Sequence, residues 1–553
     1  MSGRRAILSV AFTAIVCAGA VSAAGGRSSI TSADLRQWLT YIASDDLQGR
    51  AVYSEGFGLA AGYIQAHLQE WGIEPRGDGA SYRQAVKVEG VKTTNRSTLT
   101  VQVGKEVRTF KDGEGITFPK FVGSKRTFTA DRVEFAAYGL DAPGEHYSDL
   151  AGHDFRGAAV VFLGAAPPAS LNASIGRRLL YGRARWLTEQ MHAVAAIGPA
   201  SANRPPPRRP EDSQGRQPRP DFTTTERLDQ PEPPALTAND QFLQFLFSRA
   251  PARYDELKKK ADAGEPLTGF RLEGVKITFT LDADYEVVRT QLTQNIVAVV
   301  EGSDPQLKST YVAIGAHYDH VGYAESELGG DGKRASAPGR ITPGAENDRI
   351  WNGADDDGSG TVSLMGIARA FAQGPRPKRS ILLVWHAGEE RGLLGSLYYA
   401  DHPTVPLDHI VSQLNVDMIG RNRDDKASEA NTVYIVGSDR ISTELHEVNR
   451  AANGGIDQPL TLDYSMNDPA DPEQLYFRSD HYSYASKGIP VIFFTTGLHP
   501  DYHANTDEVS KIEFPKMTRV TQMIYETAWR LGNLDHAPVR DFKGPRAGKG
   551  THE

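Results

Sequence analysis

The feature that most constrains the fold is a series of near-continuous apolar segments after about residue 287. They read NIVAVVEG, TYVAIGAH, SILLVWHAGEE, IVSQLNVDMIG and PVIFFTTG. Helical patterns, such as those at 361–371 and 515–531, lie between them. Because Val/Ile/Leu-rich strands that alternate with helices are typical of a sheet buried on both faces, we predict an α/β fold with a doubly wound, mostly parallel sheet. Ligands of such sheets bind beyond the carboxyl ends of the strands.

The remainder of the 553 residues allows further structure around this sheet. Amphipathic helices are predicted at about 31–42 and 55–71, and short alternating strands lie between 99 and 163. We therefore expect a main domain split into 31–114 and 273–535, a β-rich insertion at 115–272 and a flexible tail at 536–553.

Proline is concentrated in one stretch of the predicted insertion. Of the 32 prolines, 10 lie in residues 199–234, together with many charged residues. Such a composition buries too little apolar surface to offset the entropy of ordering. We predict a disordered surface loop there.

The N-terminus has the pattern of a secretory signal peptide. Arg4 and Arg5 precede an apolar run at 6–21, which small residues at 22–24 follow. The run is shorter than the roughly 20 residues that span a bilayer, so we expect cleavage of residues 1–24 and a secreted or periplasmic protein, with an uncleaved anchor as the alternative. No membrane span is expected after signal removal.

Cysteine content and charge exclude several classes of protein. The only cysteine, Cys17, lies in the predicted signal peptide, so the mature chain has neither disulfides nor thiolate ligands. The formal net charge of −8 argues against a nucleic-acid partner. The sequence does not indicate an oligomeric state.

Polar residues that can bind a metal follow the predicted strands. They are His317, Asp319, Glu389, Glu390, Asp417 and His503, together with the run 355–357 in NGADDDGSG. Histidines and carboxylates at one edge of a sheet form a nitrogen and oxygen ligand set. Zinc is its natural occupant, and manganese or cobalt are alternatives.

The motifs AHYDHVG, NGADDDGSG, HAGEERGLLGS, NVDMIG and YHANTDEV resemble the co-catalytic di-zinc aminopeptidase family, which includes bacterial leucyl aminopeptidases, glutamate carboxypeptidases and the transferrin receptor ectodomain. The segments 41–50 and 60–75 resemble this family more weakly. Residues 133–163 resemble the protease-associated domain that many members carry as an insertion. The proline-rich stretch has no counterpart in the family pattern.

The resemblance implies a ligand set for two zinc ions. Asp355 would bridge the two ions, and a cis peptide would follow it, between Asp355 and Asp356. His317 and Asp417 would complete one position. Glu390 and His503 would complete the other.

The resemblance also implies roles for two further acids. Asp319 would accept the other ring N–H of His317 and fix its orientation. Glu389 would act as the general base, taking a proton from the attacking water and delivering it to the leaving amine. Tyr476 or His481 would donate a hydrogen bond to the oxyanion. The alternative is that Tyr476 only packs and that His481 lies on a helix face.

These observations favour a secreted or periplasmic metallo-exopeptidase that acts on peptides, most simply an aminopeptidase. A carboxypeptidase or dipeptidase of the same fold is the alternative, with Arg421, Arg423 or Arg478 as candidates to bind a substrate carboxylate. A non-catalytic, receptor-like binding protein would have lost ligands, whereas this sequence retains the full set. We expect His320, His386 and His499 to be structural.

Overall fold

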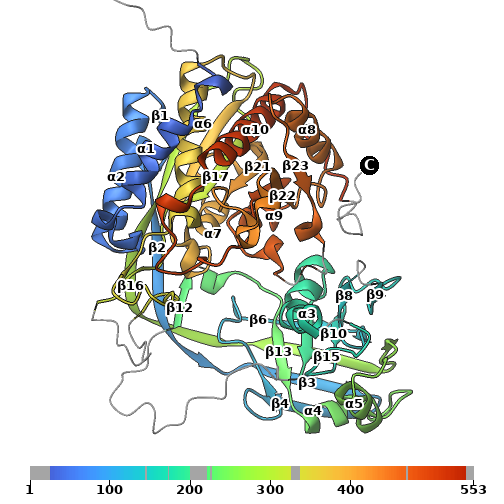
Figure 1. Cartoon of the computed structure of the whole chain (residues 1–553). Helices are drawn as coiled ribbons and strands as arrows, with labels where there is room; N and C mark the ends of the chain where they lie inside the picture. Colours follow the sequence, from blue (N-terminus) through green and yellow to red (C-terminus); the bar gives the residue numbers. More distant parts are fainter. Residues whose placement is uncertain are drawn as a thin grey trace, which may run out of the picture.

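The computed structural model describes residues 25–142, 146–171, 173–199, 221–224, 227–325, 337–468, 471 and 473–542. The predicted signal peptide, residues 200–220 of the proline-rich stretch and most of the predicted tail lie outside these residues. The described chain forms a large unit and a smaller second unit that lies below it in Figure 1. No described helix has both the length and the apolar character needed to cross a membrane.

A ten-stranded mixed sheet forms the centre of the large unit. The strands of its main path are, in spatial order, β12 (Asp221–Thr224), β2 (Arg83–Asn95), β16 (Ala283–Val300), β20 (Ser380–His386), β17 (Tyr311–His317), β21 (Ile410–Val416), β24 (Val491–Thr495), β22 (Thr432–Val436) and β23 (Thr461–Asp463), and β1 (Glu74–Pro75) pairs with β16. The α/β prediction is therefore confirmed.

Only the middle of this sheet is parallel throughout. β20, β17, β21 and β24 run parallel to one another. β16, β2 and β12 instead add to it as antiparallel strands, and β22 pairs antiparallel with β24. The predicted mostly parallel sheet is thus a mixed sheet, because β12, β2 and β16 form an antiparallel ribbon at one edge and β22 reverses direction near the other.

Helices cover both faces of the sheet, as a doubly wound fold requires. One face packs against α1 (Ser32–Ile42), α2 (Glu55–Glu70), α6 (Gly360–Gln373), α8 (Thr443–Gly454) and α10 (Phe514–Asn533), and the other packs against α7 (Leu394–Asp401) and α9 (His481–Ala485). Alternate residues of β20 enter the two cores: Leu383 lies in the first, whereas Leu382 and Val384 lie in the second. This alternation explains why the strand sequence is apolar throughout.

The first helix begins and buries its apolar face as its sequence indicates. The Thr31 side chain accepts a hydrogen bond from the Asp34 backbone N–H, which caps the helix. Leu35, Trp38, Leu39 and Ile42 are the buried residues of this helix.

The second unit contains two larger sheets that share one core, and a two-stranded sheet of β8 (Asp141–Ala142) and β9 (Tyr147–Ser148). The six-stranded sheet has the order β14 (Phe270–Arg271), β7 (Val133–Phe135), β10 (Ala159–Val161), β11 (Ala195–Gly198), β13 (Ala235–Ala238) and β5 (Ile116–Thr117). The four-stranded sheet has the order β4 (Glu106–Lys111), β3 (Thr98–Val103), β15 (Val275–Leu281) and β6 (Arg126–Ala130). Three helices accompany them: α3 (Ala173–Arg185), α4 (Asp240–Leu246) and α5 (Tyr254–Asp262).

The boundaries of the second unit differ from the expected insertion at 115–272. β3 pairs antiparallel with β15, and Leu99 and Ile277 lie in the same core. The unit therefore extends from β3 to β15. These two strands lie next to the connections to the large unit, and they pair with each other. Its relation to the protease-associated domain stays a prediction.

A long antiparallel ribbon connects the two units. β2 and β16 pair from Arg83 with Ile296 to Asn95 with Ala283. β12, at the end of the predicted disordered loop, pairs with β2. The proline-rich stretch is therefore ordered from Asp221 to Thr224, because strand pairing satisfies its backbone there.

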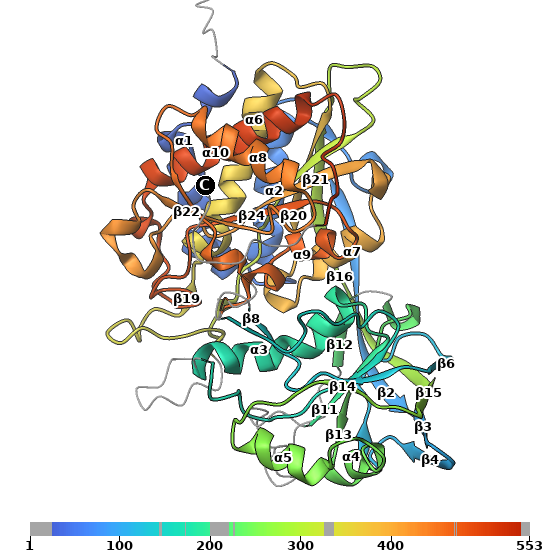
Figure 2. The ribbon, with the colours of Figure 1, turned by 90° about the vertical axis from the view of Figure 1, so that its right-hand side faces the viewer.

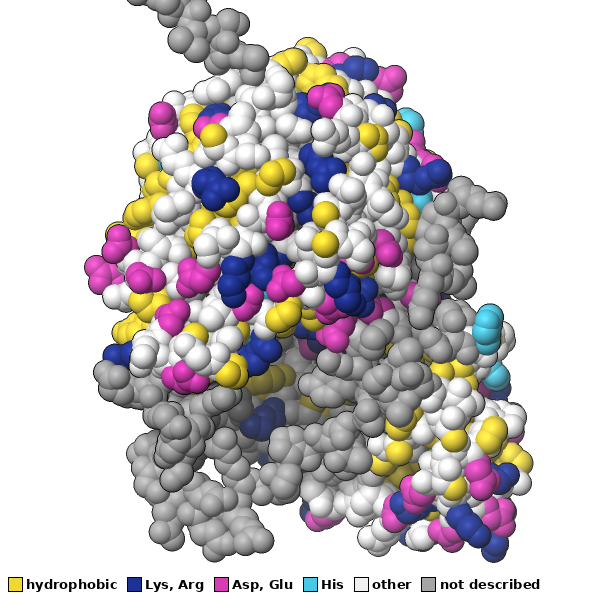
Figure 3. Space-filling view, in the orientation of Figure 1, with side chains coloured by type: hydrophobic (Ala, Val, Ile, Leu, Met, Phe, Trp, Pro, Cys, Tyr) yellow, Lys and Arg dark blue, Asp and Glu magenta, His cyan; other side chains and the backbone are white. Residues whose placement is uncertain are grey.

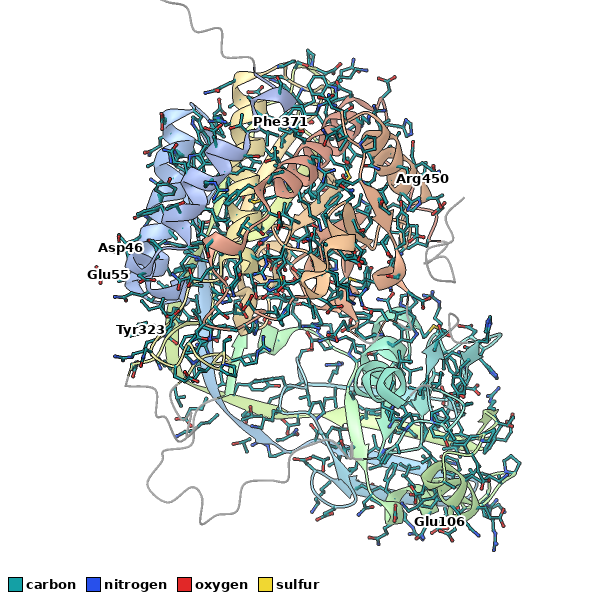
Figure 4. The ribbon with its side chains drawn as sticks, viewed as in Figure 1. Asp46, Glu55, Glu106, Tyr323, Phe371 and Arg450 are labelled. Carbon is teal, nitrogen blue, oxygen red and sulfur yellow. The ribbon has the colours of Figure 1, made fainter. Side chains whose placement is uncertain are left out.

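The carboxyl ends of the parallel strands face the second unit. In Figure 4, Tyr323, which follows β17, lies at the edge of the large unit nearer the second unit, whereas Phe371, near the end of α6, lies at the opposite end. Figures 1 and 2 show α3 on the side of the second unit that faces the large unit, with α4 and α5 on the far side. The expected ligand edge is thus enclosed between the two units.

Candidate metal centre

The sequence-predicted ligands lie at the carboxyl edge of the sheet. His317 is the last residue of β17, and Asp417 directly follows β21. Glu389 and Glu390 open a short turn, η9 (Glu389–Arg391), after β20. His503 lies in the loop after β24. The structure therefore brings these five residues to one place, from four parallel strands.

One group of donor atoms surrounds His317. Its Nε2 lies 3.3 Å from Asp356 Oδ1 and 3.7 Å from Asp417 Oδ1. A second group surrounds His503, whose Nε2 lies 3.1 Å from Asp356 Oδ2 and 3.0 Å from Glu390 Oε2. Asp356 thus faces both groups, with one carboxylate oxygen toward each.

This arrangement corrects the expected position of the bridging carboxylate. Asp355 Oδ2 lies 3.3 Å from His499 Nε2, and Asp355 Oδ1 accepts a hydrogen bond from the Gly420 N–H at 2.6 Å. Its carboxylate therefore faces residues outside the two donor groups, with one oxygen bonded to the Gly420 N–H. The cis peptide is also one residue later than expected, between Asp356 and Asp357.

The third acid of the run anchors the backbone. Asp357 Oδ1 accepts hydrogen bonds from Gly360 and Met418 N–H, and its Oδ2 accepts one from His317 N–H. Asp357 lies close enough to His317 and Asp417 to be grouped with them. Since three backbone donors already occupy its oxygens, we assign the bridging position to Asp356.

Asp507, in the YHANTDEV motif, binds the backbone of the acidic run 355–357. Its carboxylate accepts hydrogen bonds from the N–H groups of Asp355 and Asp356, at 3.0–3.1 Å. Burial raises the pKa of Asp507 to about 6, against the opposing effect of His499. The sequence analysis did not single out this residue.

Asp319 lies behind His317, with two contacts that position neighbouring groups. Its backbone oxygen lies 3.2 Å from His317 Nδ1, and its Oδ1 lies 3.7 Å from the same nitrogen. The carboxylate also accepts a hydrogen bond from the Glu389 backbone N–H at 3.2 Å. Asp319 is therefore placed to orient both the histidine and the predicted base.

The adjacent acids Glu389 and Glu390 have opposite pKa shifts. Burial raises the pKa of Glu389 well above its usual value, against the effect of His317, and the neighbouring Glu390 raises it further. Burial also opposes ionisation of Glu390, but the adjacent imidazoles of His320 and His503 lower its pKa to about 2. Two carboxyl groups with pKa values pushed apart fit an acid–base role for one and a charged ligand role for the other.

Arg50 is a buried cation beside this centre that the sequence analysis did not single out. Its guanidinium donates to the backbone oxygens of Ile42, Tyr318, Asn352 and Gly353 at 2.6–3.2 Å. It therefore joins the end of α1 to the two segments that carry His317 and the acidic run. In the sequence, only the segment LQGR marks this arginine. Its role is not visible there, because most of its partners lie some 300 positions away.

The structure does not bring Tyr476 and His481 to the metal centre. Tyr476 is buried beneath the Arg440 guanidinium, 3.9 Å from its ring centroid. The His481 ring stacks on Phe493 with centroids 4.8 Å apart, and burial lowers its pKa to about 3. Both side chains are buried in packing contacts, as the alternative held for Tyr476, so neither is placed to donate to an oxyanion.

Tyr502 and Arg478 lie beside the metal centre instead. Tyr502 stacks on the ring of His503 with centroids 4.1 Å apart. Arg478 donates to the Tyr502 hydroxyl at 3.2 Å and to Glu473 at 2.6 Å. A tyrosine directly before a predicted ligand was the available sequence signal.

Two cavities open at the metal centre. A small one, of about 40 Å³, is lined by Asp356, Asp417 and His503 together with the apolar side chains of Met418, Leu475, Phe493 and Leu498. A larger one, of about 660 Å³, reaches Glu389 and Glu390 from the second unit, where Arg185, Glu189 and Glu232 line it. Glu389, Arg478 and Tyr502 line both cavities. Figure 3 shows the surface hollowed between the two units.

The donor set fits zinc. Two imidazoles and three carboxylates converge, and Asp356 Oδ2 and Glu390 Oε1 are buried without a hydrogen-bond partner among the described residues. Buried polar atoms are rarely left unpaired, and imidazole with carboxylate is a common zinc ligand set.

Comparisons with known proteins agree with this geometry. Residues 295–528 match the model of Peptidase family M28. A probable leucine aminopeptidase of Arthroderma otae is 26% identical over 246 residues, which cover 43% of this chain and 57% of that protein. A probable leucine aminopeptidase 2 of Aspergillus oryzae is 31% identical over 245 residues, which cover 44% of this chain and 39% of that protein. The chain thus spans about half the length of the curated relatives that it matches.

Among solved structures, an aminopeptidase from Aneurinibacillus sp. strain AM-1 aligns with 94% of this chain and 99% of its own, at 16% identity and a TM-score of 0.43. The matched family region, 295–528, contains every ligand position described above. Residues 295–528 of this chain are therefore similar to Peptidase family M28, and the relatives that the chain matches include probable leucine aminopeptidases.

Proposed function

We propose that this chain is a two-zinc aminopeptidase that hydrolyses the N-terminal residues of peptides. The observation that carries the proposal is the position of Glu389, which lies beside the metal centre and lines both cavities. His317, Asp356 and Asp417 would hold one zinc ion. Asp356, Glu390 and His503 would hold the other. When bound, zinc supplies a polarising charge for the scissile carbonyl and makes water more acidic.

Glu389 is the proposed general base. A base works best when its pKa lies near the working pH, and burial already raises the pKa of Glu389 well above its usual value. The hydrogen bond from its backbone N–H to Asp319 fixes the start of the turn that carries it. In this position Glu389 takes a proton from the attacking water and then gives it to the leaving amine.

The unequal cavities support an exopeptidase. The small cavity can take one side chain, and its lining of Met418, Leu475 and Phe493 favours an apolar one. The larger cavity leaves room for the rest of a peptide on the other side of Glu389. Residues of the second unit line only this larger cavity, so we propose that this unit contacts the part of the substrate that follows the scissile bond.

A carboxypeptidase or dipeptidase is the second candidate, because one arginine reaches both cavities. Arg421 is held by Asp425 and Asp501 at 2.6 and 3.0 Å. Arg423 lies over the ring of Tyr434. Arg478 alone of the three predicted candidates lines the cavities, where it could bind a substrate carboxylate.

The test combines one variant with a peptide panel. Glu389→Gln should retain zinc and lose about 10²–10⁴-fold in turnover, because it removes the proton acceptor alone. Glu106→Gln, on the far strand β4 of the second unit, should behave as wild type. Near-normal turnover by Glu389→Gln would contradict the assignment.

The panel contains peptides with free and with blocked ends. Cleavage only where the α-amine is free supports the aminopeptidase. Cleavage that needs a free carboxylate, and that Arg478→Ala abolishes, supports the second candidate. A wild-type chain that binds zinc but cleaves none of the peptides would instead indicate a receptor-like protein.

We further propose that the mature enzyme is exported after cleavage near residue 24. Expression of the full chain in a bacterial host, followed by N-terminal sequencing of the exported protein, should find a start close to Gly25. An exported or cytoplasmic product that still begins at Met1 would contradict this.

A further inference from the structure

A third histidine, His320, lies at the edge of the second donor group. Its side chain is 1% exposed. Its Nδ1 lies 2.9 Å from Glu390 Oε1 and 3.9 Å from Asp356 Oδ2. Donor atoms of these three residues all lie within 4.8 Å of one another. His320 therefore faces the same space as His503, although neither sequence nor family resemblance assigns it a ligand role.

The facing atoms of this group lack hydrogen-bond partners. His320 Nδ1, Glu390 Oε1 and Asp356 Oδ2 are all buried, and none has a hydrogen bond of acceptable geometry among the described residues. Leaving a buried polar atom unpaired costs about 1–3 kcal/mol. Three such atoms that face one another are the arrangement expected around a cation.

The ring of His320 is held in this orientation by its packing. A Cβ atom on residue 353 would lie 2.5 Å from His320 Cγ, so Gly353 leaves the space that the ring occupies. The His320 backbone N–H donates to the Arg50 backbone oxygen at 3.2 Å. Its ring centroid lies 5.8 Å from that of His503, at an interplanar angle of 74°. Two imidazoles thus approach the acids from different directions.

The two donor groups consequently differ in number of ligands. The first comprises His317, Asp417 and one oxygen of Asp356. The second comprises His503, Glu390 and the other oxygen of Asp356, and His320 adds a fourth residue. Zinc sites with four protein ligands are typically closed, whereas sites with three keep a position open for water.

We propose that His320 is a fourth protein ligand of the second zinc position, which makes this position the tighter of the two and leaves the open one beside His317. The proposal rests on the two-zinc function above and adds a ligand to it. It predicts that the protein binds its two zinc ions with unequal affinity.

The test is a zinc titration of the full-length, chelator-stripped protein, followed by calorimetry and by competition with a chromophoric chelator. Wild type should show a tight and a weaker class of site. His320→Gln, which preserves size and polarity, should weaken the tight class by about 10- to 100-fold. The weaker class should change little. His320→Ala should give the same result.

The matched control is His446→Ala, which removes another buried histidine of the large unit, one that bonds to Ser438 away from the centre. It should leave both classes unchanged. Retention of the tight class in His320→Gln would overturn the proposal, because a glutamine can still donate to Glu390 but cannot replace an imidazole ligand. A wild-type chain that binds no zinc would instead contradict the proposed function itself.

Discussion

Arg50 and Arg183 are buried arginines, one from each unit, and their backbone partners are alike. In the large unit, Arg50 donates to four backbone oxygens. In the second unit, Arg183 donates to the backbone oxygens of Tyr138, Leu163 and Gly164 at 2.8–2.9 Å. Each guanidinium therefore satisfies carbonyl groups where strands and loops meet, which is a structural task.

The two arginines differ in the acids around them. Burial lowers the pKa of Arg50 to about 10, against four buried acids of which Asp319 has the largest effect. Burial lowers the pKa of Arg183 to about 9, and only Asp149 opposes it. The surroundings of Arg50 thus hold a surplus of negative charge that the surroundings of Arg183 lack.

This difference identifies what is functional in the site. A buried arginine bound to carbonyl groups occurs in both units and so does not indicate function. Of these two arginines, only Arg50 lies among several buried acids, and burying charges without compensation is costly. The excess is the feature that points to a bound cation in the large unit.

The largest expected effect comes from removing each arginine. Arg50→Leu should lower the free energy of unfolding by about 3–5 kcal/mol, because it leaves buried acids and carbonyls unpaired. It should also weaken zinc binding, because the segments that it joins carry the ligands. Arg183→Leu should cost about 2–4 kcal/mol and leave zinc binding unchanged. Chemical denaturation and zinc titration measure the two quantities.

Arg50→Lys is the companion variant in case the leucine variant does not fold. It keeps the charge but cannot reach four carbonyls with one ammonium group. Its zinc affinity should lie between those of wild type and Arg50→Leu. Equal loss of zinc affinity in the Arg50 and Arg183 variants would contradict the claim that only Arg50 supports the metal centre.

A smaller effect should come from Glu508, which adds to the acids near Asp507. Burial, with Asp348 and Asp45 close by, raises the pKa of Glu508 to about 7. Because this folded-state pKa exceeds the unfolded value of 4.5, the acid's contribution to stability is fully present below about pH 4.5 and is lost as the pH rises through 7. Glu508→Gln should therefore raise the melting temperature by about 1–2 °C at pH 8.5 and hardly at all at pH 5.

Thermal melts at the two pH values measure this difference. Glu106→Gln, an exposed acid of the second unit, should show no such pH dependence. Stabilisation of Glu508→Gln that is equal at both pH values would rule out titration of the acid as the cause.

The central fold could be predicted from the sequence because the strands of a sheet buried on both faces are apolar throughout. β17 and β20 have this pattern along most of their length, and all residues of β17, β20 and β21 are buried, although β21 also carries Ser412, Gln413 and Asn415. The outer strands could not be assigned in the same way, because the β2–β16 ribbon is partly exposed and pairs segments about 200 residues apart. For the same reason the ends of the second unit were misplaced.

The residue types at the site could be predicted, but not the register within 355–357. Three identical acids follow one another there, and local sequence does not distinguish them. What distinguishes them is which carboxylates are already bonded: Gly420 N–H binds Asp355, and Met418 N–H binds Asp357. Both donors lie some 60 residues away, so only the folded structure leaves Asp356 free to face both groups.

Histidine roles were equally hidden. His320 follows β17, His386 ends β20 and His499 follows β24, yet His386 lies 2.9 Å from the Tyr484 hydroxyl and His499 faces Asp355. Only His320 faces Glu390 with an unpaired nitrogen. Its orientation depends on the space left by Gly353, which no sequence pattern records.

The central claim, that Asp356 faces both metal positions and Asp355 does not, is tested most directly by the zinc content of two neighbouring variants. Zinc per chain is measured by elemental analysis of wild type, Asp355→Asn and Asp356→Asn, each prepared in the same zinc-containing buffer. The account predicts about two zinc ions per chain in wild type and in Asp355→Asn, and fewer than about one in Asp356→Asn. Full zinc content in Asp356→Asn, together with its loss in Asp355→Asn, would contradict the account.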